Sequence, residues 1–113
     1  MNNTLKGILG LCRRAGKISV GHDAARDSVK RSKACLVICC SDASQRLVRE
    51  MSEECAYGDR NIPFVCAAFD KKDLSLAIGV SAAVISVDDA GFAGKIYSEM
   101  TGGNINGIGS KEV

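Results

Sequence analysis

Cationic side chains are concentrated in the first third of this 113-residue chain, in numbers suited to binding phosphate. Residues 1–33 hold 8 of the 15 Lys and Arg residues but 2 of the 13 Asp and Glu residues, a net charge of +6, whereas the remainder carries −4. Guanidinium and ammonium groups both bind phosphate oxygens, and such a basic pole is typical of nucleic-acid-binding proteins. Seven of the cations fall close together: Arg13, Arg14, Lys17, Arg26, Lys30, Arg31 and Lys33.

Two glycines divide this basic segment and predict where an anion binds. Gly16 is placed to end a first helix in the left-handed conformation, and Gly21 to open a second helix. A helix start has free N–H groups and the positive end of the helix dipole, which attract phosphate. We therefore expect the cations to lie beside the start of the second helix. The residues expected at this site are Arg13, Arg14, Lys17, Gly21, His22, Asp23, Arg26 and Lys30.

Catalytic chemistry has little support in the sequence. His22 is the only histidine, and no nucleophile elbow, phosphate-binding Walker loop or zinc-protease motif occurs. Asp42, Asp88 and Asp89 follow predicted strands, where many α/β proteins place functional acids, but each also directly precedes a predicted helix. Helix capping is the favoured interpretation of all three carboxylates. We expect no enzymatic activity and no cofactor.

Six cysteines require an explanation. There is no Cys-x-x-Cys pair and only one histidine to complete a metal site, and most of the cysteines fall inside apolar segments. We expect reduced, buried thiols and no metal or disulfide. The cysteines are Cys12, Cys35, Cys39, Cys40, Cys55 and Cys66.

Hydrophobic periodicity predicts alternating helices and strands. Leu5, Ile8, Leu9 and Cys12 follow helical spacing, whereas the continuous apolar run 34–40 is typical of a strand buried on both faces. The predicted helices cover about 4–15, 22–31, a segment ending at Gly58, a segment from Asp70 to Gly79, and a last helix with Phe92, Ile96 and Met100 inward. The predicted strands are 18–20, 34–40, 64–67 and 82–87. The predicted capping residues are Thr4, Ser41 or Asp42, Asp70, and Asp88 or Asp89.

This element order predicts an α/β fold with a mostly parallel or mixed four-stranded sheet and helices on both faces. The length suits one domain, for which we expect residues 1–100, followed by a disordered glycine-rich tail at 101–113. No apolar run approaches the ~18–20 residues that span a bilayer, and the N-terminus lacks signal-peptide features. We expect a cytoplasmic monomer without membrane contact.

The chain resembles the kink-turn RNA-binding ribosomal protein family, which includes the archaeal large-subunit "seven-Ae" and "thirty-e" proteins, and most of all its small bacterial YlxQ-like branch. The likeness extends from about residue 4 to 97 and is carried by several motifs in order. They are Gly-Leu-Cys-Arg-Arg-Ala-Gly-Lys at 10–17 followed by Gly21, Lys-Ala-Cys-Leu-Val-Ile at 33–38, Ser-Asp-Ala-Ser at 41–44, Asn-Ile-Pro at 61–63, and Leu-Ala-Ile-Gly at 76–79.

The resemblance implies a three-layer α/β/α sandwich, a cytoplasmic role in binding RNA, and no catalysis. In the family, the glycine-led start of the second helix enters the kinked RNA, and an apolar loop after the fourth helix covers an extruded nucleotide. Gly21 matches the leading glycine. The apolar loop corresponds to Ile78, Gly79 and Val80.

The contact motif itself departs from the family pattern Gly-Thr-Asn-Glu-x-x-Lys. Asp23 replaces an amide that both donates and accepts with a carboxylate that only accepts, and Ala24 removes the glutamate. Asp27 stands where the family has lysine, and Arg26 lies one residue earlier, about 100° around the helix. Each lost bidentate base contact costs on the order of 1–3 kcal/mol of discrimination, so the sequence predicts reduced kink-turn specificity.

Our first hypothesis is a non-enzymatic binder of structured RNA, ribosomal RNA or another kink-turn-containing RNA, that belongs to or associates with the ribosome. Only 4% of residues are aromatic, which argues against recognition by base stacking. The alternative is a protein-interaction module on the same fold, with its acidic remainder facing a basic ribosomal protein. A third class, the RNA-recognition domain of a methyltransferase, needs a catalytic domain for which this chain has no room.

Overall fold

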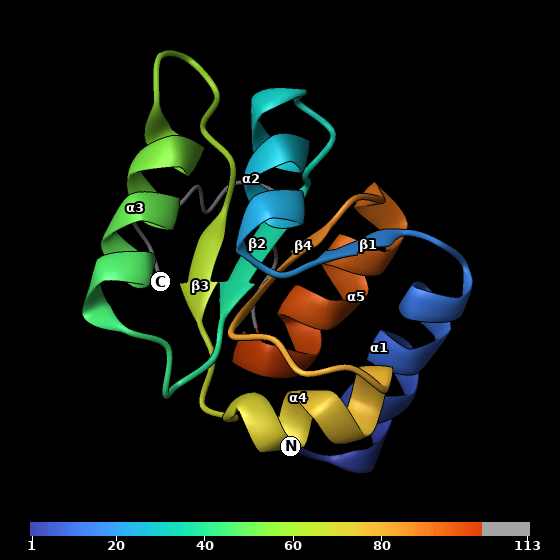
Figure 1. Cartoon of the computed structure of the whole chain (residues 1–113). Coiled ribbons are helices and arrows are strands. Elements are labelled where there is room, and N and C mark those ends of the chain that lie inside the picture. Colours follow the sequence, from blue (N-terminus) through green and yellow to red (C-terminus); the bar gives the residue numbers. More distant parts are fainter. Residues whose placement is uncertain (103–113) are drawn as a thin grey trace.

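The computed structural model describes residues 1–102, which form an α/β domain in which five helices alternate with four strands (Figure 1). This confirms the predicted alternation. The elements are α1 (Asn3–Arg14), β1 (Ile18–Val20), α2 (His22–Lys30), β2 (Leu36–Cys39), α3 (Gln45–Ala56), β3 (Phe64–Cys66), α4 (Lys71–Ile78), β4 (Val84–Val87) and α5 (Ala90–Thr101).

The sheet is mixed, with strand order β1-β4-β2-β3. Strands β2 and β3 are parallel and are joined by the crossover helix α3, whereas β4 is antiparallel to both of its neighbours. Val87 is the register partner of Ile18 on one side and of Leu36 on the other. The mixed sheet is confirmed, and the mostly parallel alternative is wrong because β4 enters between two strands that run the opposite way.

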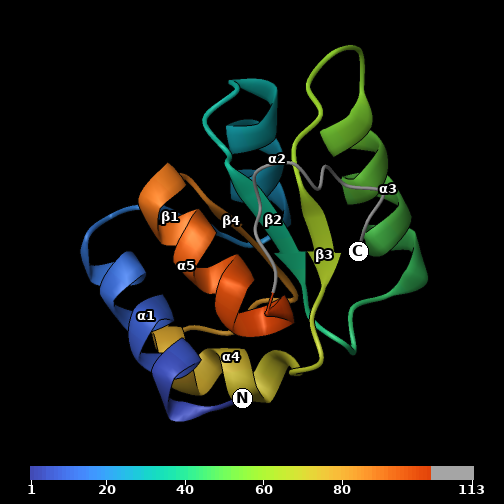
Figure 2. The ribbon, with the colours of Figure 1, turned by 180° about the vertical axis from the view of Figure 1, so that it is seen from behind.

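Two helical layers cover the sheet. Helices α1, α4 and α5 pack on one face and α2 and α3 on the other, as the two opposite views show (Figures 1 and 2). Leu36 and Ile38 point into the first layer, and Val37 and Cys39 into the second. This division explains the continuous apolar run at 34–40, since a strand covered on both faces has no polar side.

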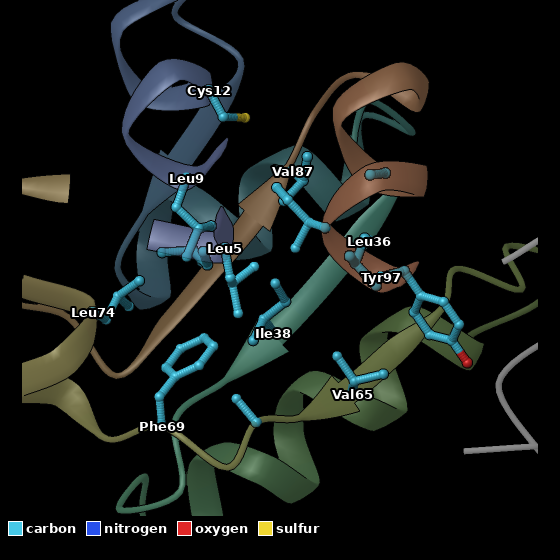
Figure 3. Packing of buried hydrophobic residues seen from close by; sticks show 14 of the residues in the cluster. Leu5, Leu9, Cys12, Leu36, Ile38, Val65, Phe69, Leu74, Val87 and Tyr97 are labelled. Atoms are coloured by element: carbon cyan, nitrogen blue, oxygen red, sulfur yellow. The ribbon is translucent and has the colours of Figure 1, made fainter. Parts of the chain in front are cut away.

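The larger core lies between the sheet and the α1, α4 and α5 layer (Figure 3). Leu9, Cys12, Leu74 and Ile96 are fully buried there, and Tyr97 is 1% exposed. Side chains from three helices meet the same strand face, so the helix positions are set by packing as well as by local propensity.

Two helix starts differ from the sequence prediction. Asn2, rather than Thr4, caps α1 through a 2.7 Å bond from the Leu5 N–H to its Oδ1. Ser44, rather than Ser41 or Asp42, caps α3 through the Leu47 N–H, because two turn residues intervene before the helix begins. Asp42 instead accepts the N–H of Lys71, the first residue of α4.

The other predicted caps agree with the structure. Asp70 and Asp73 form a reciprocal capping box at the start of α4, and Asp89 caps α5 through the N–H of Phe92. Asp88 does not cap a helix. No helix among residues 1–102 is long and apolar enough to cross a membrane. The predicted tail lies outside the described residues from position 103 onward.

Candidate functional site

The start of α2 is held by β-sheet geometry. Gly21 has φ +94° and ψ 169°, a conformation that L side chains rarely adopt, and it donates its backbone N–H to the carbonyl of Val84 at 2.9 Å. This bond continues the pairing of β1 with β4 by one residue. It places the first turn of α2 beside the segment 79–83, which joins α4 to β4.

This start is the one helix N-terminus among residues 1–102 without a capping side chain. Asn2, Ser44, Asp70 and Asp89 cap the other four helices. In α2 the first helical bond runs from the Ala25 N–H to the Gly21 carbonyl at 2.9 Å, so the N–H groups of the preceding helical residues are left for an external acceptor. An anion is the natural ligand of such a terminus.

The segment predicted to cover a nucleotide is only partly available. Ile78 is the last residue of α4 and is buried in the larger core, and Val80 is half-buried against the same core. Gly79 is exposed and ends α4 in the left-handed conformation, with φ +84°. The surface offered by these three residues is therefore mainly that of the Gly79 backbone.

His22 and Arg26, in the first half of α2, both face glutamates of α3. Arg26 Nε lies 3.4 Å from Oε2 of Glu54, and His22 Nε2 lies 3.2 Å from Oε2 of Glu50. The His22 nitrogen is itself buried and lacks the alignment of a hydrogen bond to that carboxylate. These partners were not predicted from the sequence, although Glu50 and Glu54 share the four-residue spacing of His22 and Arg26.

A groove of about 590 Å³ runs between α2 and α3 over these ion pairs. Tyr57, 71% exposed, lies at this groove with the Arg60 guanidinium 5.1 Å from its ring centroid. The lining alternates positive and negative groups, which disfavours a phosphate as its occupant. The lining residues are His22, Arg26, Lys30, Glu50, Glu53, Glu54, Tyr57 and Arg60.

The remaining predicted cations do not lie beside Gly21. Lys17 precedes β1 and Gly21 follows it, so four residues of extended chain, about 13 Å, separate them. Arg13 and Arg14 end α1 next to Lys17, and Lys30 ends α2. Strand β1 thus separates Lys17 from the start of α2, and the RNA-binding role of these cations stays a prediction.

All six cysteines are free thiols. Cys12, Cys39, Cys40 and Cys55 are buried, as the sequence predicts, whereas Cys35 is only half-buried. Burial raises the pKa of Cys39 and of Cys55 to about 12, because the thiolate loses hydration. Cys66 differs in being exposed at the end of β3. Within the described residues, no group of three or more His, Cys, Asp or Glu side chains is placed to hold a metal ion.

Known proteins resemble the chain in sequence and in fold. The model of the ribosomal protein L7Ae/L30e/S12e/Gadd45 family matches residues 3–96. The RNA-binding protein YlxQ of Bacillus subtilis (strain 168) is 32% identical over 92 residues, 80% of this chain and 89% of the relative. The RNA-binding protein YlxQ of Enterococcus faecium is 27% identical over 88 residues, 78% and 82% of the two chains.

Solved structures with a similar fold include an RNA-binding protein. A Bacillus halodurans C protein of unknown function superposes with a TM-score of 0.78 and 30% identity, covering 86% of this chain and 96% of that one. The Giardia lamblia 15.5kD RNA binding protein gives a TM-score of 0.68 and 26% identity, covering 90% and 88%. The likeness thus extends over nearly the whole of the described domain.

Proposed function

The chain belongs to the ribosomal protein L7Ae/L30e/S12e/Gadd45 family, and from this premise we propose that it binds structured RNA through the start of α2. The names of the YlxQ relatives and of the 15.5kD protein, which describe RNA binding, support the proposal. Family membership and these names identify a binding protein and not an enzyme.

The observation that carries the proposal is the uncapped terminus at Gly21. The N–H groups there have the geometry and the dipole to bind an RNA phosphate or base edge. The bond to Val84 keeps this terminus in place before RNA arrives, so little ordering cost accompanies binding.

The finer proposal is a kink-turn-like RNA of the ribosome or of a ribosome-associated particle in the cytoplasm. Family membership supports it, whereas Asp23, Ala24 and Asp27 weaken the contacts by which such an RNA is distinguished from a duplex. We therefore expect a modest preference for a kink-turn, with most of the affinity coming from phosphate contacts.

Competition between a kink-turn RNA and a simple duplex of equal length, at two salt concentrations, tests both the RNA binding and the kink-turn preference. We expect binding of both RNAs, a steep loss of affinity with salt, and a several-fold preference for the kink-turn. Absence of binding to either RNA at low salt would overturn the proposed function. Equal affinity for the two RNAs would overturn only the kink-turn preference.

A single substitution tests whether the α2 terminus is the contact. Asp23 is exposed in the first turn of α2, and its carboxylate repels a phosphate bound there. We expect Asp23→Asn to tighten RNA binding several-fold, because it removes that repulsion and adds a donor. The matched control is Asp59→Asn, an exposed carboxylate beyond α3 with the same change in charge. Equal effects of the two substitutions would exclude the α2 terminus as the site.

A further inference from the structure

We infer that the domain carries a second phosphate-binding surface at the opposite end of β1 from Gly21, and that it binds the backbone of an RNA duplex. The inference rests on the proposed RNA-binding function and divides the predicted single site into two. We call this surface the basic end. It consists of the exposed cations Arg13, Arg14, Lys17, Lys30 and Lys33.

Strand pairing brings the basic end together from two separate segments. Ile18 and Leu36 both pair with Val87, so their strands lie two spacings apart, about 10 Å. Lys17 immediately precedes Ile18, and its carbonyl accepts the N–H of Asp88 at 2.8 Å. Cys35 donates its N–H to Val87 at 2.7 Å, which holds the chain after α2 against the same end of β4. Figure 1 shows this end, where α1 passes into β1 and β4 into α5.

The cations of the second segment follow the end of α2. The N–H of Lys33 bonds to the Ser28 carbonyl at 2.9 Å, and Ser32 adopts φ +60°, so the chain turns tightly out of the helix. Lys30 lies in the last helical turn. Lys33 stands two residues before Cys35, which bonds to Val87, so it approaches the same end of β4 as Lys17, which bonds to Asp88.

Ion pairing distinguishes the cations of the basic end from His22 and Arg26, although Lys30 of the basic end also lines the α2–α3 groove. None of the five cations at the basic end forms an ion pair within residues 1–102, whereas His22 and Arg26 both face glutamates of α3. The nearby carboxylates already have partners among residues 1–102. Asp27 pairs with Arg31 at 3.1 Å, Asp88 accepts three hydroxyl groups, and Asp89 caps α5.

An exposed cationic surface without ion pairs fits a polyanion. No aromatic side chain occurs between residues 1 and 33, so the surface is suited to phosphates rather than to stacked bases. Nine residues of helix α2, about 13 Å, separate it from the Gly21 terminus, so the two surfaces reach different phosphates of one folded RNA. Once one surface binds the RNA, the other surface meets it at a high effective concentration, so the two contacts together raise the affinity.

The test is charge reversal at the basic end with a matched control. The test variant carries Arg14→Glu, Lys17→Glu and Lys33→Glu. The control carries Lys6→Glu, Arg49→Glu and Lys95→Glu, three exposed cations of α1, α3 and α5 that lie outside the basic end. Affinity for the kink-turn RNA and for the duplex is measured over a salt series. We expect the test variant to lose at least tenfold in affinity for both RNAs and to reduce the slope of log K against log salt by about 2–3. We expect the control to change that slope by less than about 1.

The outcomes separate this inference from the proposed function. If the test variant keeps the wild-type RNA affinity and salt slope, the second surface is overturned and the Gly21 site is unaffected. This result is also expected if the basic end binds an acidic protein instead of RNA. Equal losses in the test and control variants would overturn it too. If charge reversal unfolds the domain, the neutral variant Arg14→Gln, Lys17→Gln, Lys33→Gln replaces it, with a slope reduction in the same direction expected. Failure of the wild-type chain to bind RNA at all overturns the proposed function itself.

Discussion

Ser28 donates its hydroxyl to Oδ1 of Asp88 at 2.6 Å, which joins the inner face of α2 to the end of β4. Ser86 donates to the same oxygen at 2.8 Å, and Ser19 of β1 donates to Oδ2 at 2.6 Å. One carboxylate thus satisfies hydroxyl groups from three elements, two of them on buried serines. Asp88 therefore fixes α2 relative to β1 and β4, and the two proposed RNA surfaces lie at opposite ends of β1.

Removal of this carboxylate tests its structural role. We expect Asp88→Ala to lower the free energy of unfolding by about 2–4 kcal/mol, because buried hydroxyl groups lose a charged acceptor. Asp89→Ala is the control, for which loss of a helix cap predicts a decrease of about 1 kcal/mol. Urea denaturation of both variants measures the difference. Equal losses would contradict the joining role of Asp88.

The backbone at Gly21 gives a second prediction. A Cβ at this position meets no neighbouring atom, but φ +94° is strained for any L side chain. We expect Gly21→Ala to destabilise the domain by about 1–3 kcal/mol. Gly7→Ala, inside α1 and also free of steric contact, is expected to stabilise it by about 0.5–1 kcal/mol. Thermal unfolding measures whether each variant is more or less stable than the wild type. An unchanged stability of Gly21→Ala would show that the backbone relaxes at this position.

The pairing of Arg26 with Glu54 gives a third prediction. Glu54 also receives Nη1 of Arg60 at 3.0 Å on its other carboxylate oxygen. We expect Glu54→Gln to lower the free energy of unfolding by about 1 kcal/mol and to tighten RNA binding, because Arg26 is released toward solvent. The control is Glu53→Gln, on the same helix turn and without an ion pair in residues 1–102. An equal gain in RNA affinity for both variants would assign the effect to net charge alone.

Buried thiols give a prediction in alkaline solution. Burial raises the pKa of Cys39 and of Cys55 from 9.0 to about 12, so the folded state keeps protons that the unfolded state releases above pH 9. The free energy of unfolding should therefore hold below pH 9 and fall between pH 9 and 12. Urea denaturation across this range measures the slope. We expect Cys55→Ala to make this slope shallower, because one buried thiol with a raised pKa is removed.

The core is largely predictable because its signals are local. The helical spacing of Leu5, Leu9 and Cys12 and the apolar run 34–40 are enough to identify the buried faces, since each pattern lies within a few turns or one strand. The caps are less predictable, because several polar residues precede each helix and the chosen one depends on which backbone is extended. Asn2 and Ser44 have that extended conformation, and the chain before α3 makes a turn first.

The candidate site also has one part that is predictable from sequence and one part that is not. Gly21 is identifiable from sequence because only glycine suits its backbone, whereas the partners of His22 and Arg26 become visible once α2 lies beside α3. The sequence by itself determined the elements, the excess of positive charge and the glycine-led helix, because periodicity, composition and backbone preference act within a few residues. The strand 18–20 already put Lys17 and Gly21 at opposite ends, but the folded sheet adds that Lys17 and the segment after α2 meet at one end of β4. The reason is that strand order and direction, set by long-range pairing with β4, determine which distant charges become neighbours.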